Sequence, residues 1–334
     1  MGSILTGADG GKSLSINGDY AYIAESDLGI AIVDIRTPAS LSVAGTVATI
    51  GDAQSVLVDG NTAYICDGWN GVQILDITNK SLPIWKGAYS VASGFAYKAT
   101  ISGNTLYVAF DAEGVHAVNV SDPENPSYDF KNDSIDDVKD VYYQDGVVYA
   151  ALNSAIGTGG LKILDSTDLT ESGSVASIDI TRLAYATDGA AKYIYATAGS
   201  AGIKVLDVTI PASASTVATK DMSTSINDVI VDDGYIYATG SSDKLFRFDL
   251  GTSYTALATE AYSLNPSTQP KSVTKTGEYL YLASNNGITV IHANDKVISG
   301  DMTVAFSANH AVSVGDYVYV ADSSAGLTIH NKID

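Results

Sequence analysis

Apolar residues in this chain occur in short runs, and successive runs are joined in pairs by a glycine-containing turn. The segments SVLVDGNTAYICD (residues 55–67) and DVIVDDGYIYATG (residues 228–240) show this pattern. β-Branched and aromatic residues on both sides of a turn with Asn or Asp and Gly are typical of a β-hairpin, because such turns need a positive φ angle. Helices would not tolerate glycine at this place in every copy. The pattern therefore predicts antiparallel strands.

The pattern occurs eight times, and a tyrosine in the second run marks each copy. These tyrosines are Tyr22, Tyr64, Tyr107, Tyr149, Tyr195, Tyr237, Tyr281 and Tyr319, spaced 38 to 46 residues apart. Seven residues after most of them stands a glycine, such as Gly71, and five residues further a polar residue such as Asp76. We expect Asp76 and its equivalents to accept backbone N–H groups in a turn.

Each copy contains enough chain for four strands. In the second copy we expect them at about residues 53–58, 62–66, 71–77 and 84–91. Both faces of the third strand are apolar, with Val72, Ile74 and Leu75, which suits a sheet packed between two neighbours. A unit of this length with four strands, repeated along the chain, is typical of a β-propeller blade.

The expected fold is an all-β, eight-bladed β-propeller of four-stranded antiparallel blades, and residues 1–334 form a single domain. The last copy ends at HNKID, directly after its third strand, and so lacks a fourth. The segment near the N-terminus is similar to the fourth-strand segments of other copies. We therefore expect residues 3–8 to pair near residues 327–333, so that an N-terminal strand completes the last blade and closes the ring.

The third-strand sequences IAIVDI, VQILDI, LKILD and IKVLDV resemble the repeat of the LVIVD-repeat family of bacterial and archaeal propellers. The resemblance covers nearly the whole chain. It implies a propeller that is secreted or surface-associated and that shares no common catalytic chemistry. We therefore expect an extracellular or cell-surface location, although the sequence shows no signal-peptide pattern, and we find no transmembrane run.

The chain carries a formal net charge of −20. An acidic surface disfavours a general role in binding nucleic acid or anionic membranes. Cys66 is the single cysteine, so no disulfide can form within the chain.

The two positions that precede the first apolar residue of each innermost strand have an unusual composition. They hold five of the 18 Lys and Arg residues, where a random spread would place about one. In a propeller the innermost strand lines the central channel, so we expect a partial ring of positive charge at one channel mouth. The pairs are Lys12-Ser13, Gln54-Ser55, Tyr97-Lys98, Lys139-Asp140, Thr181-Arg182, Asn227-Asp228, Lys271-Ser272 and His310-Ala311.

Two interpretations of this ring remain open. In the first, the channel mouth captures a small anionic group, a carboxylate or a phosphate. In the second, the basic residues pair with acids such as Asp140 and Asp228 and order water in the channel. The candidate ligand-binding residues are Lys12, Lys98, Lys139, Arg182, Lys271 and His310, together with Gln54 and Tyr97.

Other candidate chemistry is sparse, and the sequence shows no catalytic motif. We expect no cofactor. Calcium is one possibility, because Asp133, Asp136 and Asp137 could offer oxygen ligands, although their spacing is not that of an EF-hand loop. A solvated acidic loop is the alternative. Trp69 and Phe110, with Tyr97, could form a platform for a sugar or a protein.

The sequence favours a non-catalytic binding scaffold that presents its loop face to a protein or cell-surface partner. By loop face we mean the face with the loops that join strands two and three and the connections between blades. One alternative is an enzyme or small-ligand binder that captures an anionic group at the basic channel mouth. Another is a self-assembling structural protein, a homo-oligomer or larger array.

Overall fold

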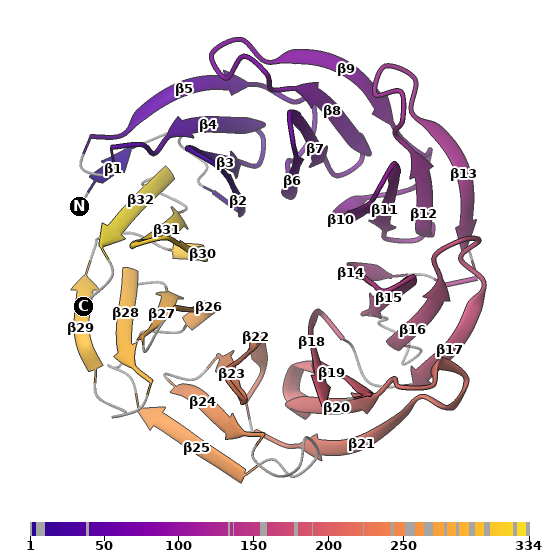
Figure 1. The fold of residues 1–334 in the computed structure, drawn as a ribbon, viewed down its shortest axis with the longest axis vertical. Helices are drawn as coiled ribbons and strands as arrows, with labels where there is room; N and C mark the ends of the chain where they lie inside the picture. The colour runs from indigo at the N-terminus through magenta and orange to yellow at the C-terminus, as the bar shows by residue number, and fades with distance from the viewer. Residues whose placement is uncertain are drawn as a thin grey trace.

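The computed structural model is a ring of β-sheets around a common axis, and the chain runs once round it (Figure 1). The structure describes residues 2–4, 11–37, 40–132, 134–135, 137–153, 159–176, 180–188, 190–222, 224–241, 244–250, 258–263, 270–276, 279–284, 287–293, 298–303, 308–322 and 326–331. Each sheet has four antiparallel strands. The prediction of an all-β propeller with four-stranded antiparallel blades is confirmed.

The strands follow the chain from the axis to the outer rim of each blade. The innermost strands are β2 (Ser13–Asn17), β6 (Ser55–Asp59), β10 (Ala96–Ser102), β14 (Val138–Gln144), β18 (Arg182–Asp188), β22 (Ile226–Asp232), β26 (Pro270–Thr276) and β30 (Ala308–Val314). The second strands are β3 (Tyr20–Ala24), β7 (Thr62–Cys66), β11 (Thr105–Phe110), β15 (Val147–Leu152), β19 (Ala191–Thr197), β23 (Tyr235–Gly240), β27 (Tyr279–Ser284) and β31 (Tyr317–Asp322).

The two remaining positions of each blade are filled in the same order. The third strands are β4 (Ile30–Asp34), β8 (Val72–Asp76), β12 (Gly114–Asn119), β16 (Gly160–Asp165), β20 (Ile203–Asp207), β24 (Lys244–Asp249), β28 (Gly287–His292) and β32 (Gly326–Asn331). The outer strands are β5 (Ser42–Val47), β9 (Ile84–Tyr89), β13 (Ser127–Asn132), β17 (Glu171–Ala176), β21 (Ser215–Lys220), β25 (Ala258–Ser263), β29 (Ile298–Thr303) and β1 (Gly2–Ile4). Two short 3₁₀ helices are η1 (Gly199–Ala201) and η2 (Pro211–Ser213).

The hydrophobic core lies between neighbouring blades. Tyr22 and Ile32 of the β2–β5 blade belong to one cluster with Ile65 and Leu75 of the β6–β9 blade. The tyrosines that mark the repeat are at most 4% exposed. Full burial of an apolar side chain stabilises the folded state by on the order of 2 kcal/mol. The residue that marks each repeat is therefore one that packs neighbouring blades together.

The repeat glycine after the second strand allows a close approach of two backbones. Gly71 has φ +73°, and a Cβ atom built on it would lie 2.2 Å from the carbonyl oxygen of Tyr89. β8 can therefore approach β9 this closely only because position 71 has no side chain.

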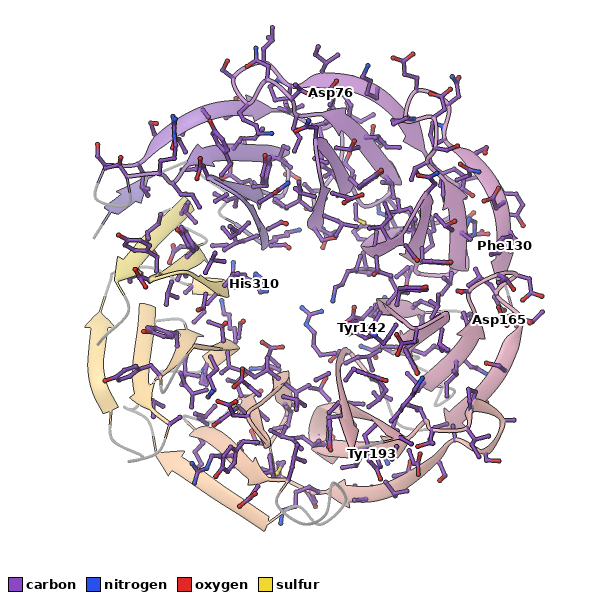
Figure 2. All side chains as sticks on the ribbon, in the orientation of Figure 1. Asp76, Phe130, Tyr142, Asp165, Tyr193 and His310 are labelled. Atoms are coloured by element: carbon purple, nitrogen blue, oxygen red, sulfur yellow. The ribbon has the colours of Figure 1, made fainter. Side chains whose placement is uncertain are left out.

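The polar residue at the end of the third strand forms the expected turn. Asp76 Oδ1 accepts the backbone N–H of Thr78 at 2.8 Å. Equivalent bonds to the residue two positions on are made by Asp34, Asn119, Asp165 and Asp207. Asp76 and Asp165 accordingly lie toward the outside of the ring (Figure 2).

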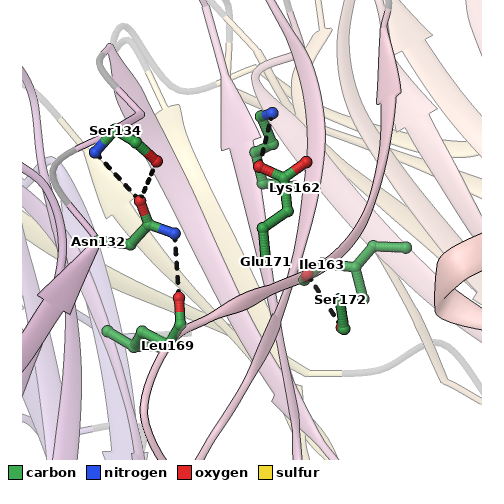
Figure 3. Close-up of polar contacts among 7 residues, drawn as sticks. All are labelled: Asn132, Ser134, Lys162, Ile163, Leu169, Glu171 and Ser172. Carbon is green, nitrogen blue, oxygen red and sulfur yellow. Dashed lines mark hydrogen bonds and ion pairs between the residues drawn. The ribbon is translucent and has the colours of Figure 1, made fainter.

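Polar contacts also connect neighbouring blades at the rim (Figure 3). The Asn132 side-chain amide donates to the carbonyl oxygen of Leu169 at 3.0 Å, across from one blade to the next. Lys162 and Glu171 form an ion pair of 2.8 Å within the following blade. An exposed ion pair contributes roughly 0.2–1 kcal/mol and a single hydrogen bond about 1 kcal/mol, so apolar packing dominates the joint.

The N-terminal strand completes the last blade. β1 pairs antiparallel with β32, with Ser3 opposite Thr328 and Ile4 opposite Leu327. The two strands lie side by side in Figure 1. The predicted closure is confirmed for residues 3 and 4, and the strand begins one residue earlier, at Gly2. Residues 5–8 of the predicted strand lie outside the described part of the chain. No helix among the described residues is long and apolar enough to cross a membrane.

Candidate functional site

The innermost strands place two residues of every blade at one mouth of the ring. The deeper residue of each pair lies opposite the second residue after the repeat tyrosine, as Lys98 lies opposite Ala109. We call these residues the lower ring: Ser13, Ser55, Lys98, Asp140, Arg182, Asp228, Ser272 and His310. We call the residues that precede them the upper ring: Lys12, Gln54, Tyr97, Lys139, Thr181, Asn227, Lys271 and Asn309.

A β-bulge aims several upper-ring residues at the axis. The register of β10 with β11 skips Tyr97, and the register of β14 with β15 skips Lys139. The same irregularity occurs at Asn227, Lys271 and Asn309. A bulged residue is left out of the ladder and its side chain is redirected, which explains why two successive residues reach the same space.

The upper ring opens on the loop face. The backbone N–H of Ala53, just before β6, donates to the carbonyl oxygen of Ser26 in the β3–β4 turn at 3.0 Å. The N–H of Ala96 donates to the carbonyl oxygen of Gly68 in the β7–β8 turn at 2.9 Å. The turns between second and third strands thus contact the segments that lead into the next innermost strand.

The two rings enclose a cavity on the axis. Its narrower part has a volume of about 280 Å³ and is lined by the whole lower ring and most of the upper ring. A wider part of about 620 Å³ lies among upper-ring residues, with Asn153 and Ile226 at its edge. All eight predicted ligand-binding residues line this cavity, and His310 is seen at the inner wall in Figure 2. That they bind a ligand stays a prediction.

Three lysines of the cavity already have carboxylate partners. Lys12 pairs with Asp52 at 2.5 Å, Lys98 with the buried Asp140 at 2.6 Å, and Lys139 with Asp111 at 2.5 Å. Burial alone would lower the pKa of Lys139, but the Asp111 carboxylate and a hydrogen bond of 3.1 Å to the Tyr97 hydroxyl raise it above its ordinary value. Part of the positive ring is therefore structural, as the second interpretation expected.

Arg182 differs from these lysines. Its side chain is exposed in the cavity, and its hydrogen bond to the carbonyl oxygen of Thr181 is long, at 3.5 Å. Within the described residues it forms no ion pair with a carboxylate. Asp228 of the next blade is engaged by its own neighbours, since it accepts the N–H of Val273 at 3.1 Å and of Val229 at 3.0 Å. Burial raises the pKa of Asp228, although the charge of Arg182 opposes that rise.

His310 is uncharged at neutral pH. Burial lowers its pKa to about 4, and the positive charges of Arg182 and Lys98 add to the effect. On the neighbouring blade Lys271 donates to the side-chain oxygen of Asn309 at 2.7 Å, and the Asn309 amide donates to the carbonyl oxygen of Gly11 at 2.9 Å. The ring therefore continues as a chain of side-chain hydrogen bonds from blade to blade.

The sequence prediction was wrong for one pair. Asn309, rather than His310, holds the upper-ring position, so His310 lies one level deeper and Ala311 is buried in the core. The spacing to the repeat tyrosine would have found Asn309, because it precedes Tyr319 by ten residues, as Lys12 precedes Tyr22 and Lys139 precedes Tyr149.

The predicted aromatic platform is half wrong. Trp69 is 65% exposed in the β7–β8 turn, but Phe110 is fully buried and packs between blades with Tyr89 and His116. Its side of the second strand faces the neighbouring blade. Phe95 takes its place beside Trp69, with ring centroids 5.2 Å apart.

The calcium prediction is only partly open to inspection. Asp133 and Asp136 lie outside the described residues, whereas Asp137 is described and has φ +56°. Among the described residues no group of three or more His, Cys, Asp or Glu side chains is placed to hold a metal ion.

Comparison with known proteins identifies the repeat. The family model named LVIVD repeat matches residues 10–49, 50–91, 93–133 and 308–330. No curated protein matches the chain.

Several solved structures share the fold at low sequence identity. The computationally designed Ika8 protein is 12% identical with a TM-score of 0.76, over 99% of this chain and 100% of that chain. Sqt1 from Saccharomyces cerevisiae is 9% identical with a TM-score of 0.79, over 99% and 98%. BamB from Moraxella catarrhalis is 14% identical with a TM-score of 0.63, over 83% and 80%. The protein is a β-propeller that carries LVIVD repeats over these matched residues.

Proposed function

We propose that this protein is a non-catalytic binding scaffold that presents its loop face to a protein or cell-surface partner. An anionic group of that partner, a carboxylate or a phosphate, enters the central cavity. The observation that carries the proposal is Arg182, an exposed guanidinium on the cavity wall that forms no ion pair within the described residues.

The chemistry of the wall favours an anion. Arginine presents a planar fork of N–H donors that matches carboxylate and phosphate oxygens, often two at a time. Lys98 and Lys139 already have carboxylate partners, yet their ammonium groups still line the same cavity. The protein has a net charge of −20, so its surface in general repels anions and the basic cavity is where an anion is attracted.

The lining supports binding rather than turnover. Asp140 is paired with Lys98, and Asp228 accepts two backbone N–H groups, so both carboxylates are engaged. His310, with its pKa near 4, is a poor proton acceptor at neutral pH. The same groups serve well to fix the position of a bound anion.

We extend the proposal to the whole chain and its surroundings. Eight copies of the repeat and the four-stranded sheets of the structure support a single eight-bladed domain of residues 1–334. We include an extracellular or cell-surface location, because the propellers that this repeat resembles are secreted or surface-associated.

Thermal unfolding in the presence of anions tests the proposal. Sulfate, phosphate, citrate and short dicarboxylates are titrated at constant ionic strength, which separates specific binding from screening. An anion present at about 100 times its Kd adds roughly 2.7 kcal/mol to the free energy of unfolding. We expect such stabilisation in the natural protein and its loss in Arg182→Gln.

A matched control is available on the outer rim. Lys86→Gln removes the same charge from β9, where Lys86 pairs with Glu124 at 3.0 Å, far from the cavity lining. This variant should keep the full response to anions. Equal responses of Arg182→Gln and Lys86→Gln, or no response to any anion in the natural protein, would overturn the proposal.

A further inference from the structure

A line of aromatic rings connects the loop face with the basic cavity. The exposed Trp69 touches Phe95 edge-on, with centroids 5.2 Å apart, and Phe95 lies 4.7 Å from Tyr97 of the upper ring. The Nζ atom of Lys139 sits 4.2 Å from the centre of the Tyr97 ring. We call Trp69, Phe95 and Tyr97 the aromatic track.

The track is held rigidly. A Cβ atom on Gly68 would lie 2.9 Å from the Phe95 ring, so the glycine before Trp69 lets that ring pack against the turn. Phe95 and Tyr97 are half-buried, whereas Trp69 stays 65% exposed. The indole is therefore fixed from one side and offers its remaining surface to solvent. A preorganised aromatic surface loses little conformational entropy when a ligand covers it.

The backbone along the track is already hydrogen-bonded. The carbonyl oxygen of Gly68 accepts the N–H of Ala96 at 2.9 Å, and that of Phe95 accepts the N–H of Asp111 at 3.0 Å. The carbonyl oxygen of Tyr97 accepts the Ser55 hydroxyl at 2.9 Å. A peptide that binds by adding a strand needs such groups to be unpaired. The track thus offers ring faces and side chains, not a backbone edge.

We propose that the loop face binds an acidic oligosaccharide, whose sugar ring covers Trp69 and whose carboxylate reaches the cations of the central cavity. Pyranose rings present C–H groups on their faces and hydroxyl groups on their edges, which suits an exposed indole surrounded by polar loops. Uronic acids add a carboxylate for Arg182, which forms no ion pair within the described residues, and Lys139 contributes a second positive charge on the same cavity wall. The inference rests on the proposed anion site and names its ligand class.

The dimensions of the track set the size of the ligand. Three steps of 5.2, 4.7 and 4.2 Å separate the Trp69 ring from Lys139 Nζ, so the two ends are at most about 14 Å apart. About two or three linked pyranose rings span that length and place one ring at each end. A trisaccharide is therefore long enough for the whole track, and the free uronic acid serves as the probe of the cavity end alone.

Tryptophan fluorescence tests this inference directly. The chain has two tryptophans, and Trp85→Phe on the outer strand β9 leaves Trp69 as the sole indole. In this background the probes are uronic-acid trisaccharides of α-1,4 and β-1,4 linkage, their neutral counterparts, the free uronic acids and triglutamate. We expect at least one acidic trisaccharide to change the Trp69 emission and to bind more tightly than its neutral counterpart.

Three variants separate this inference from the proposed function. Their binding is measured by calorimetry, because the two substitutions of Trp69 remove the fluorescent reporter. Trp69→Ala, at an exposed site, should weaken acidic trisaccharide binding about tenfold or more and leave binding of the free uronic acid unchanged. Arg182→Gln should weaken both. Trp69→Tyr should restore most of the trisaccharide affinity, since it restores an aromatic face.

Each other outcome refutes a defined part. If Arg182→Gln weakens both ligands but Trp69→Ala weakens neither, the aromatic track is not a binding surface and only the anion site stands. If Trp69→Ala matters and Arg182→Gln does not, the cavity is not the anion site. Binding of triglutamate that equals the trisaccharide and depends on Trp69 would replace the sugar with an acidic peptide. Failure of every acidic trisaccharide to bind would overturn the inference outright.

Discussion

Glu25 should make the protein less stable as the pH rises. It lies in the β3–β4 turn on the loop face and is only 2% exposed. Burial raises the pKa of its carboxyl group from 4.5 to about 7. In the unfolded chain the group regains its ordinary pKa, so the native state favours the protonated form more than the unfolded state does.

The size and sign of the effect follow from this difference. Because the pKa is raised on folding, the favourable contribution is complete below pH 4.5 and is lost as the pH rises through 7. One pKa unit corresponds to about 1.4 kcal/mol, so the ionised group costs about 3 kcal/mol at pH 8. Glu25→Gln cannot ionise and avoids that cost. The free energy of unfolding of the variant, relative to the natural protein, should therefore increase by about 3 kcal/mol between pH 4.5 and pH 8.

Urea-induced unfolding at several pH values measures this difference. Glu124→Gln is the control, because Glu124 has a side chain that is 63% exposed and pairs with Lys86 at the rim. Its effect should stay within a few tenths of a kcal/mol at every pH. A difference between Glu25→Gln and the natural protein that is the same at pH 4.5 and at pH 8 would refute the reasoning.

Three further predictions concern the backbone, the ring closure and the cavity. Gly71→Ala should lower the free energy of unfolding in urea by on the order of 3 kcal/mol, because it adds a clash with the Tyr89 carbonyl oxygen to a φ of +73°. Gly60→Ala, at φ +55° with open space around it, should lower it by only about 1 kcal/mol. Equal losses would show that the backbone relaxes the close approach at Gly71. Removal of residues 2–4 should lower the thermal midpoint and cause concentration-dependent association in light scattering, because it exposes the edge of β32, and an unchanged midpoint would contradict the closure. The affinity for sulfate should be constant from pH 6 to 8 and increase below pH 5, where His310 becomes charged. His310→Asn should show no such increase. An inflection near pH 6.5 would mean that the imidazole does not form part of the cavity wall.

The repeat made most of the fold predictable. One tyrosine per copy marks the buried second strand. In most copies one glycine marks the close approach of the third strand to the outer strand, although Lys244 takes its place in the sixth copy. The closure was also predictable, since the last copy lacked a fourth strand and a similar segment stood at the N-terminus. Val72, Ile74 and Leu75 are all buried as the two apolar faces required.

The site was predictable as a set of positions but not as a network. The axis-facing pairs follow from strand order alone, and only the pair at His310 was misplaced, because the small residue Ala311 was passed over as the first apolar residue of β30. Ion pairs such as Lys139 with Asp111 join different blades, and no local pattern announces them. Phe95 lies in a connection between blades, where no periodicity indicates which side chains turn inward.

Because β1 pairs with β32, the ring does not depend on the blade in which the chain begins. β1 and β32, which lie near the two ends of the chain, meet in one sheet. If those ends were linked, new ends could be opened between the third and outer strands of any other blade, and the same ring would result with a different outer strand closing it. The order of the cavity residues along the gene would then change while their order around the axis stayed the same. Circular permutation thus offers a way to move the point of attachment around the rim without disturbing the recess at its centre.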